Sequence, residues 1–284
     1  MTIKSLENCP FDTLFEAFSA AFSDYNRQWD AAQLRAMLAR RGFDPALSFA
    51  AYDDTSRIAA FTLNGIGSFN GRRTAYDTGT GTRQAYRGRG LAAEIFRHAL
   101  PRLARYGIRQ YLLEVLQENK AAVSVYRGLG FEVSREFDYF VRPNSEITGC
   151  DLPRTSPFRL VPTAAAPDGE LLPFGDFRPS WQNSAESILR AAKQIAGYDL
   201  RCGERTIGRI FFEPASGDIA WIAVDREFRR QGAATLLLQA AAGAIRSDSI
   251  RVVNTECSCD SIREFLKSNG FIHSGKQFEM ILGI

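Results

Sequence analysis

Histidine and cysteine, the residues most often used for metal binding and nucleophilic catalysis, are scarce in this 284-residue sequence. The two histidines, His98 and His273, lie far apart, which gives little support to a histidine metal site or a Ser-His-Asp arrangement. The five cysteines include one close pair, Cys257 and Cys259, and no second pair that would complete a zinc site. We therefore expect no metal centre, and we interpret the cysteines as reduced thiols.

Long apolar runs and a strong excess of one charge are also absent. The first ten residues, MTIKSLENCP, contain no apolar signal core, and no stretch approaches the roughly 18 apolar residues of a membrane-spanning helix. The net charge of +3 is too small to indicate a nucleic-acid partner. The sequence therefore predicts a cytoplasmic globular protein without a membrane segment and argues against nucleic-acid binding.

One short phrase is present twice. Residues 87–92 read RGRGLA and residues 229–234 read RRQGAA, so both fit Arg-x-x-Gly-x-Ala at an offset of 142 positions. Each phrase follows an expected strand and opens an expected helix. The pair Gly130-Phe131 is repeated as Gly270-Phe271 at an offset of 140 positions. Two anchors at nearly the same offset indicate a duplicated domain.

The order of expected elements supports that division. Residues 1–142 alternate strand and helix patterns, and residues 158–284 repeat the order. Between them, residues 143–157 contain three prolines and no periodicity, which is typical of a linker. The predicted fold class is therefore α/β, with two tandem domains that each contain a twisted mixed sheet flanked by helices.

The first copy of the phrase is suited to an anion. At a strand-to-helix junction the first backbone N–H groups of the helix have no internal partner and favour a phosphate. Gly88 and Gly90 would let a phosphate approach the backbone closely, and Arg87 and Arg89 add positive charge. By itself the phrase is a weak signal, because a solvated basic turn has the same composition.

A second cluster follows in LLEVLQENKAAVSVYRGLGF, residues 112–131. It places Glu114, Asn119 and Tyr126 where a strand end, a loop and a helix could meet in one cleft. A tyrosine hydroxyl can donate a proton to a leaving thiolate, and a carboxylate can accept one from an attacking amine. The ordinary alternatives are that Tyr126 packs in the core, Asn119 caps a helix and Glu114 lies on the surface.

Together these runs resemble the GNAT superfamily of acyl-CoA-dependent N-acyltransferases. The resemblance implies that the loop at 87–92 holds the CoA diphosphate and that Thr80 and Thr82 bond the pantetheine arm. In that family an asparagine matching Asn119 contacts the cofactor, and a tyrosine matching Tyr126 is the usual general acid. The LEV run is similar to ribosomal-protein alanine acetyltransferases, which implies Glu114 as the base. The implied cofactor-binding residues are Thr80, Thr82, Arg87, Gly88, Arg89, Gly90, Leu91, Ala92 and Asn119.

The second half departs from this pattern. Leu266 stands at the position of Tyr126, Cys259 at that of Asn119, and Asn254 at that of Glu114. We therefore expect residues 158–284 to form a degenerate, non-catalytic GNAT-like domain and residues 1–142 to carry the chemistry.

Four further residues are weaker candidates for the acceptor site. Asp24, Tyr25 and Trp29 follow the first expected helix, where this fold often lines its acceptor pocket, although packing and turn roles suit them as well. Asp77 lies on a glycine-rich strand and competes with Glu114 for the role of base.

The expected function is transfer of an acetyl group from acetyl-CoA to a primary amine of a small-molecule or peptide acceptor. The alternative is a non-catalytic acyl-CoA-binding or sensor protein on the same scaffold. Retention of Glu114 and Tyr126 in one half favours the enzyme. The sequence leaves the acceptor, the acyl chain and the oligomeric state open.

Overall fold

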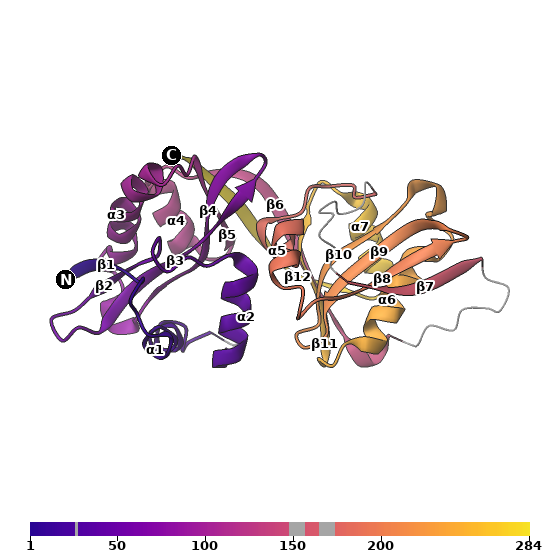
Figure 1. The fold of residues 1–284 in the computed structure, drawn as a ribbon, viewed down its shortest axis with the longest axis horizontal. Coiled ribbons are helices and arrows are strands. Elements are labelled where there is room, and N and C mark those ends of the chain that lie inside the picture. The colour runs from indigo at the N-terminus through magenta and orange to yellow at the C-terminus, as the bar shows by residue number, and fades with distance from the viewer. Residues whose placement is uncertain (26–27, 148–156, 165–173) are drawn as a thin grey trace. The chain divides into compact units, whose positions relative to one another are not determined.

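The chain divides into two compact units in the computed structural model, which describes residues 1–25, 28–147, 157–164 and 174–284. Unit 1 consists of Met1–Arg135 together with Phe278–Ile284, and unit 2 consists of Glu136–Gln277. Each unit is an α/β domain with a mixed sheet flanked by helices, so the predicted fold class is confirmed (Figure 1).

The expected linker at 143–157 lies mostly outside the described residues, because 148–156 are not described. The boundaries of the compact units, after Arg135 and after Gln277, do not coincide with the expected boundaries at 142 and 158. Each unit instead includes a strand segment that belongs to the other half of the sequence.

Unit 1 has the strand order β1-β2-β3-β4-β5, followed by the end of β12. Its first four strands are antiparallel, and β4 and β5 are parallel. The elements are β1 (Thr2–Ser5), α1 (Phe11–Ala21), α2 (Ala31–Arg41), β2 (Phe49–Tyr52), β3 (Ile58–Phe69), β4 (Arg72–Thr82), α3 (Leu91–Arg105), β5 (Gln110–Leu116), α4 (Lys120–Gly128) and the end of β12 (Ile272–Gly283).

The two faces of the unit 1 sheet are covered by different helix pairs (Figure 1). One apolar cluster joins α3 and α4 to the sheet, and the other joins α1 and α2. Phe49 and Ala51 belong to the first cluster and Ala50 to the second, as the alternation of side chains along β2 requires. The helices form because their apolar residues recur at helical spacing; Leu14, Ala17, Phe18 and Ala21 make the buried stripe of α1.

Unit 2 repeats this plan with the strand order β6-β11-β10-β9-β8-β7. One apolar cluster joins α6 and α7 to the sheet, and a second surrounds α5. The elements are β6 (Glu132–Pro143, in unit 2 from Glu136), β7 (Phe158–Thr163), α5 (Ala185–Arg190), β8 (Ala196–Cys202), β9 (Arg205–Glu213), β10 (Asp218–Val224), α6 (Ala233–Ala244), β11 (Ser249–Glu256) and α7 (Asp260–Ser268).

Each half of the sequence supplies a strand to the compact unit of the other half. Met280, on β12, is fully buried in the α3/α4 cluster of unit 1, and Phe140, on β6, is fully buried in the α6/α7 cluster of unit 2. Within unit 1, the Arg135 guanidinium bonds both carboxylate oxygens of Glu279 at 2.9 and 2.6 Å. Neither core is therefore complete without residues from the other side of the duplication.

Candidate functional site

The parallel strands β4 and β5 of unit 1 separate along their length. They pair only over Thr74–Tyr76 and Gln110–Leu112. A β-bulge at Thr78 follows, after which β4 stays paired with β3 as far as Thr82. The side of β4 that faces β5 therefore has no strand partner beyond Tyr76, and its backbone edge can bond an extended ligand.

The phrase at 87–92 forms the start of α3 at the end of β4. Gly88 and Gly90 both have φ of 76°, a conformation that side chains disfavour, and Gly90 is the N-cap of the helix. A Cβ placed on either glycine would meet nothing within 4 Å, so the loop borders open space. Leu91 is buried in the α3/α4 cluster and fixes the helix start. The free N–H groups of the first turn of this 15-residue helix are thus placed to bind an anion.

Arg87 does not extend from this loop as a free cation. Its guanidinium donates to both Asp24 oxygens at 2.6 and 2.9 Å, to the Ala21 carbonyl at 2.9 Å and to the Thr82 carbonyl at 3.2 Å. The hydrogen bond from Arg87 lowers the pKa of Asp24 to about 2. Arg87 thus ties the end of α1 to the end of β4, and Arg89, which donates to the Ala85 carbonyl at 3.1 Å, is the more peripheral arginine of the loop.

Tyr126 meets Asp77 and Thr80 across the separated strands. The Tyr126 hydroxyl donates to Asp77 Oδ2 at 3.1 Å, and the Thr80 hydroxyl donates to the same oxygen at 2.8 Å. The Gly79 N–H donates to Asp77 Oδ1 at 2.9 Å. Burial raises the pKa of Asp77 to about 6, against the lowering effect of these three donors. Burial and the negative charge of Asp77 raise the pKa of Tyr126 well above its ordinary value, so Tyr126 keeps its proton.

Aromatic packing holds Tyr126 in place. Its ring is edge-on to Phe96 and Phe131, with centroid distances of 5.7 and 5.8 Å. Tyr126 and Asp77 are each 8% exposed, so a small part of the pair reaches the surface. The packing role that the sequence allowed for Tyr126 is therefore present, and the hydroxyl of the same side chain donates to Asp77.

Glu114 and Asn119 do not join Tyr126. The neighbours of Glu114 on β5, Leu113 and Val115, both lie in the α3/α4 cluster, so Glu114 points to the opposite face of the sheet. There it is hydrogen-bonded with Tyr76, and its charge helps to raise the pKa of Tyr76 after the larger effect of burial. Asn119 is the N-cap of α4, and its side chain accepts from the Ala122 N–H at 3.1 Å.

The candidates that follow α1 lie beside Arg87 or pack against α1 and α2. Asp24 is the partner of Arg87. Tyr25 is 47% exposed and lies edge-on to Phe22 at 5.2 Å, and Trp29 packs against the α1/α2 cluster. Residues 26–27 of this segment lie outside the described residues.

Unit 2 repeats the local structure around the second phrase. β10 has a bulge between Ile219 and Trp221, and β10 pairs with β11 only at Asp218–Ile219. Gly232, with φ of 83°, is the N-cap of α6. The two bulges occupy matching positions at the offset of 142, so the duplication extends to the distortion of the strand.

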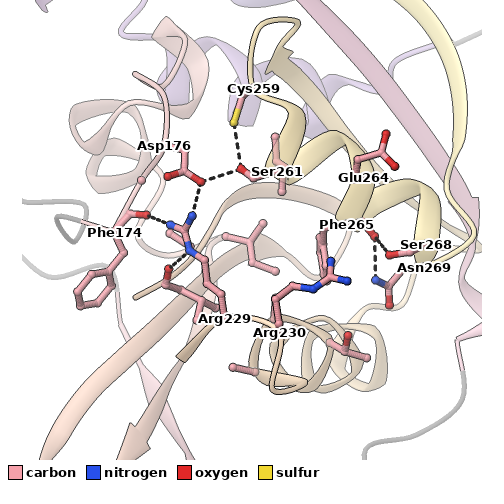
Figure 2. Close-up of a pocket in the computed structure, with 18 of the residues that line it drawn as sticks. Phe174, Asp176, Arg229, Arg230, Cys259, Ser261, Glu264, Phe265, Ser268 and Asn269 are labelled. Carbon is pink, nitrogen blue, oxygen red and sulfur yellow. Dashed lines mark hydrogen bonds and ion pairs between the residues drawn. The ribbon is translucent and has the colours of Figure 1, made fainter. Parts of the chain in front are cut away.

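A cavity of about 650 Å³ opens beside this loop in unit 2 (Figure 2). Such a volume is typical of sites for small ligands. Its walls are β10, the start of α6, α7 and the segment at 174–177. The lining residues are Phe174, Gly175, Asp176, Phe177, Trp221, Ile222, Ala223, Val224, Arg229, Arg230, Gly232, Ala233, Ala234, Thr235, Cys259, Asp260, Ser261, Ile262, Glu264, Phe265, Ser268 and Asn269.

Arg229, the first arginine of the second phrase, is held by hydrogen bonds in the same way as Arg87 in unit 1. Arg229 donates to Asp176 at 2.7 Å, to the Phe174 carbonyl at 3.0 Å and to the Val224 carbonyl at 2.9 Å. Arg230 stands where unit 1 has Gly88 and has φ of 62°, so the loop keeps its shape although the glycine is lost. Figure 2 shows the Arg230 side chain extending toward Phe265 on α7. The sequence did not predict this cavity. The one available signal was Arg230, which stands at the position of Gly88 and distinguishes the second loop from the first.

The three hydrogen-bonded residues Asp77, Thr80 and Tyr126 of unit 1 have no polar counterparts in unit 2. At the offset of 142 along the bulged strand, Ile219 and Ile222 stand for Asp77 and Thr80, and Leu266 stands for Tyr126. Unit 2 therefore keeps the glycine-capped helix start and has a cavity beside it, with apolar residues at the three positions where unit 1 has Asp77, Thr80 and Tyr126.

Among the described residues, no group of three or more His, Cys, Asp or Glu side chains is placed to hold a metal ion. In the same part of the chain, every helix is too short or too polar to cross a membrane.

Comparison with known proteins agrees with the duplicated plan. Residues 11–131 match the acetyltransferase (GNAT) family, and residues 191–273 match an acetyltransferase (GNAT) domain. No curated protein matches the sequence.

Solved structures with the same fold cover nearly the whole chain. A tandem GNAT protein from the clavulanic acid biosynthesis pathway has a TM-score of 0.72 at 13% identity, with 99% of this chain and 98% of that chain covered. A GCN5-related N-acetyltransferase from Sphaerobacter thermophilus has a TM-score of 0.67 at 12% identity, covering 99% and 95%. A GCN5-related N-acetyltransferase from Anabaena variabilis has a TM-score of 0.58 at 13% identity, covering 99% and 72%. The chain therefore belongs to the GNAT acetyltransferase family and carries two GNAT domains in tandem.

Proposed function

We propose that this protein is an acyl-CoA-dependent N-acyltransferase that transfers an acetyl group from acetyl-CoA to a primary amine, and that unit 1 performs the chemistry. The observation that supports this assignment best is the position of the Tyr126 hydroxyl. It lies where β4 and β5 have separated, in the same unit as an open anion-binding helix start. A proton donor and a phosphate site in one unit are what thioester aminolysis by a CoA ester needs.

Two parts of unit 1 are suited to contact the donor. The backbone from Gly88 to Ala92 would bind the diphosphate, because the loop borders open space and ends in free N–H groups. The unpaired edge of β4 at Thr80 and Thr82 would bond the pantetheine arm. Arg87 holds the loop in place through Asp24 and contributes to binding indirectly.

Two side chains are assigned to proton transfer. Glu114, on the opposite face of β5 from Tyr126, accepts a proton from the ammonium form of the acceptor. Tyr126 donates a proton to the thiolate that leaves when the tetrahedral intermediate collapses. A backbone N–H near Thr82 stabilises the oxyanion of that intermediate. The acceptor is a small-molecule or peptide amine, reached from the side of Asp24, Tyr25 and Trp29.

A second activity is proposed for unit 2, namely binding of an acyl-CoA without turnover. The observation that favours it is the cavity of about 650 Å³ beside a retained anion-binding loop, with Leu266 and Ile219 in place of Tyr126 and Asp77. Unit 2 can therefore hold the ligand class of its family but lacks the groups that move protons in unit 1.

The experiment uses matched substitutions in the two loops. Gly90→Asp and Gly232→Asp each place a carboxylate at a helix N-cap with positive φ and open space, so their structural costs should be similar. Release of free thiol from acetyl-CoA is measured with a panel of primary amines, and CoA binding by calorimetry. We expect Gly90→Asp to abolish transfer, and Gly232→Asp to keep transfer within about threefold, a barrier change of roughly 0.7 kcal/mol, while removing one CoA site. Loss of transfer in Gly232→Asp with full activity in Gly90→Asp would overturn the assignment to unit 1.

A further inference from the structure

The Tyr126–Asp77 pair joins residues that are 49 positions apart in the sequence. Asp77 lies next to the bulge of β4, and Tyr126 lies near the end of α4. The carboxylate accepts from the Tyr126 hydroxyl, the Thr80 hydroxyl and the Gly79 N–H. A buried carboxylate that is hydrogen-bonded to the proposed acid and to two further donors is placed to take part in the same proton transfer.

The net reaction requires a proton carrier. Once the acceptor is a neutral amine, amide formation moves one proton from nitrogen to sulfur, because the C–N bond forms and the C–S bond breaks. Tyr126 by itself is poorly suited to deliver that proton, since its hydroxyl is directed at Asp77 and its pKa is raised well above the ordinary value by burial and by the Asp77 charge. A tyrosinate left beside an ionised Asp77 would add a second negative charge to a buried site.

We propose that Asp77 and Tyr126 form a single proton-transfer unit, in which Asp77 is the residue that makes Tyr126 an effective acid. As the C–N bond forms, the nitrogen loses its proton to the Asp77 carboxylate. Neutral Asp77 then donates that proton to the Tyr126 oxygen while the Tyr126 O–H bond breaks and an S–H bond forms on the departing thiolate. Both side chains return to their starting states, and Glu114 is left with the separate task of deprotonating the ammonium. This inference rests on the proposed function of unit 1.

The surroundings of Asp77 suit a group that alternates between charged and neutral forms. The pKa of Asp77 near 6 means that it is ionised at neutral pH and can still hold a proton briefly. The titratable and charged groups that act on the pair are Tyr76 on β4, Tyr111 on β5, Arg41 on α2 and Tyr25 in the segment after α1. Glu114 on β5 acts on Tyr76.

Unit 2 offers a comparison within the same chain. Ile219 and Leu266 replace the two members of the pair, and Ile222 replaces Thr80, although the bulge, the loop and the helix are retained. The pair and its supporting donor are therefore absent together where the proposed function assigns no turnover. A pair with only a structural role would also be lost together, so the test needs readouts that packing does not change.

The test compares Asp77→Asn, Tyr126→Phe and the double variant in the full-length protein, with acetyl-CoA and the fastest amine of the panel. Asp77→Asn keeps the shape of the side chain and cannot carry the proton. We expect its kcat to fall roughly 10²-fold with the KM for acetyl-CoA within about threefold, and the double variant to be no slower than Tyr126→Phe. The parent should lose kcat as the pH falls below about 6, where Asp77 is already protonated, and Asp77→Asn should lack that limb.

The matched control is Asp53→Asn, since Asp53 also accepts a tyrosine hydroxyl, that of Tyr86 at 2.6 Å, but is only partly buried. It should keep the parent's kcat and pH profile. Full activity of Asp77→Asn, or losses that multiply in the double variant, would overturn the proton-transfer unit while leaving the enzyme assignment intact. A parent protein that acylates no amine would overturn both. Carbon-13 NMR of labelled aspartate should show Asp77 titrating near pH 6, and an ordinary midpoint near 4 would also overturn it.

Discussion

Removal of the Tyr126 hydroxyl should separate catalysis from packing. Tyr126→Phe keeps the ring contacts with Phe96 and Phe131 at 5.7 and 5.8 Å and deletes only the group that donates to Asp77. General acid catalysis is typically worth about 10²–10⁴-fold, or roughly 3–5 kcal/mol of barrier, so kcat should fall by that factor. Loss of one hydrogen bond to an ionised carboxylate should lower the free energy of unfolding by only about 1.5–3 kcal/mol.

The pH dependence of that stability loss follows from the same contact. The Tyr126 hydroxyl lowers the pKa of Asp77 against the effect of burial, so its removal should raise that pKa above about 6. The stability difference between parent and variant should therefore be largest above pH 7 and shrink below pH 6, where Asp77 becomes neutral.

The assay pairs steady-state thiol release with urea unfolding, and Tyr106→Phe is the control because Tyr106 is 53% exposed at the end of α3. The control should retain full kcat. Turnover of Tyr126→Phe within threefold of the parent would remove Tyr126 from the mechanism and reduce it to a packing residue. A collapse in stability with normal CoA binding per folded molecule would show that the ring contacts were misjudged.

Three further outcomes follow from the contacts. Because the pKa of Asp77 rises from 3.8 in the unfolded chain to about 6 in the fold, its contribution to stability is fully present below about pH 4 and is lost as the pH rises through 6. Asp77→Asn should remove this pH dependence of about 3 kcal/mol in the free energy of unfolding, which urea unfolding from pH 4 to 8 would detect. Arg135→Met leaves the Glu279 carboxylate, which is 3% exposed, without its cation and should lower the free energy of unfolding by about 3–5 kcal/mol. A loss below about 1 kcal/mol by thermal unfolding would contradict burial of the pair. Removal of residues 278–284 should expose the site of Met280 and lower the melting temperature of unit 1, and an unchanged melting curve would disprove the strand exchange.

The sequence by itself determined the local features of both domains. Helical spacing of apolar residues, such as Leu14 and Phe18 in α1, predicted the helices, because periodicity is a property of neighbouring residues. Each of the two phrases was predicted to lie between a strand and a helix, and Gly90 and Gly232 are indeed helix N-caps, both with positive φ. The family resemblance and the tandem plan also followed from these short runs and are confirmed.

Only the tertiary structure decided how distant residues combine. Asp77 was a rival to Glu114 in the sequence, and the fold instead pairs it with Tyr126, because the bulge in β4 and the position of α4 bring them within 3.1 Å. Glu114 points to the other face, since alternation along β5 depends on which neighbours are buried. Arg87 is bound to Asp24 across 63 positions, which composition could not reveal.

The exchange of strands between the halves could not be predicted from any pattern in the sequence. A strand's own residues predict that it will be half-buried, but its partner is set by which sheet edge is free after the rest of the chain has folded. Met280 thus completes the core of unit 1, and Phe140 completes that of unit 2, although each belongs by sequence to the other half. The cavity in unit 2 likewise depends on tertiary packing, because its walls come from β10, α6, α7 and the segment at 174–177.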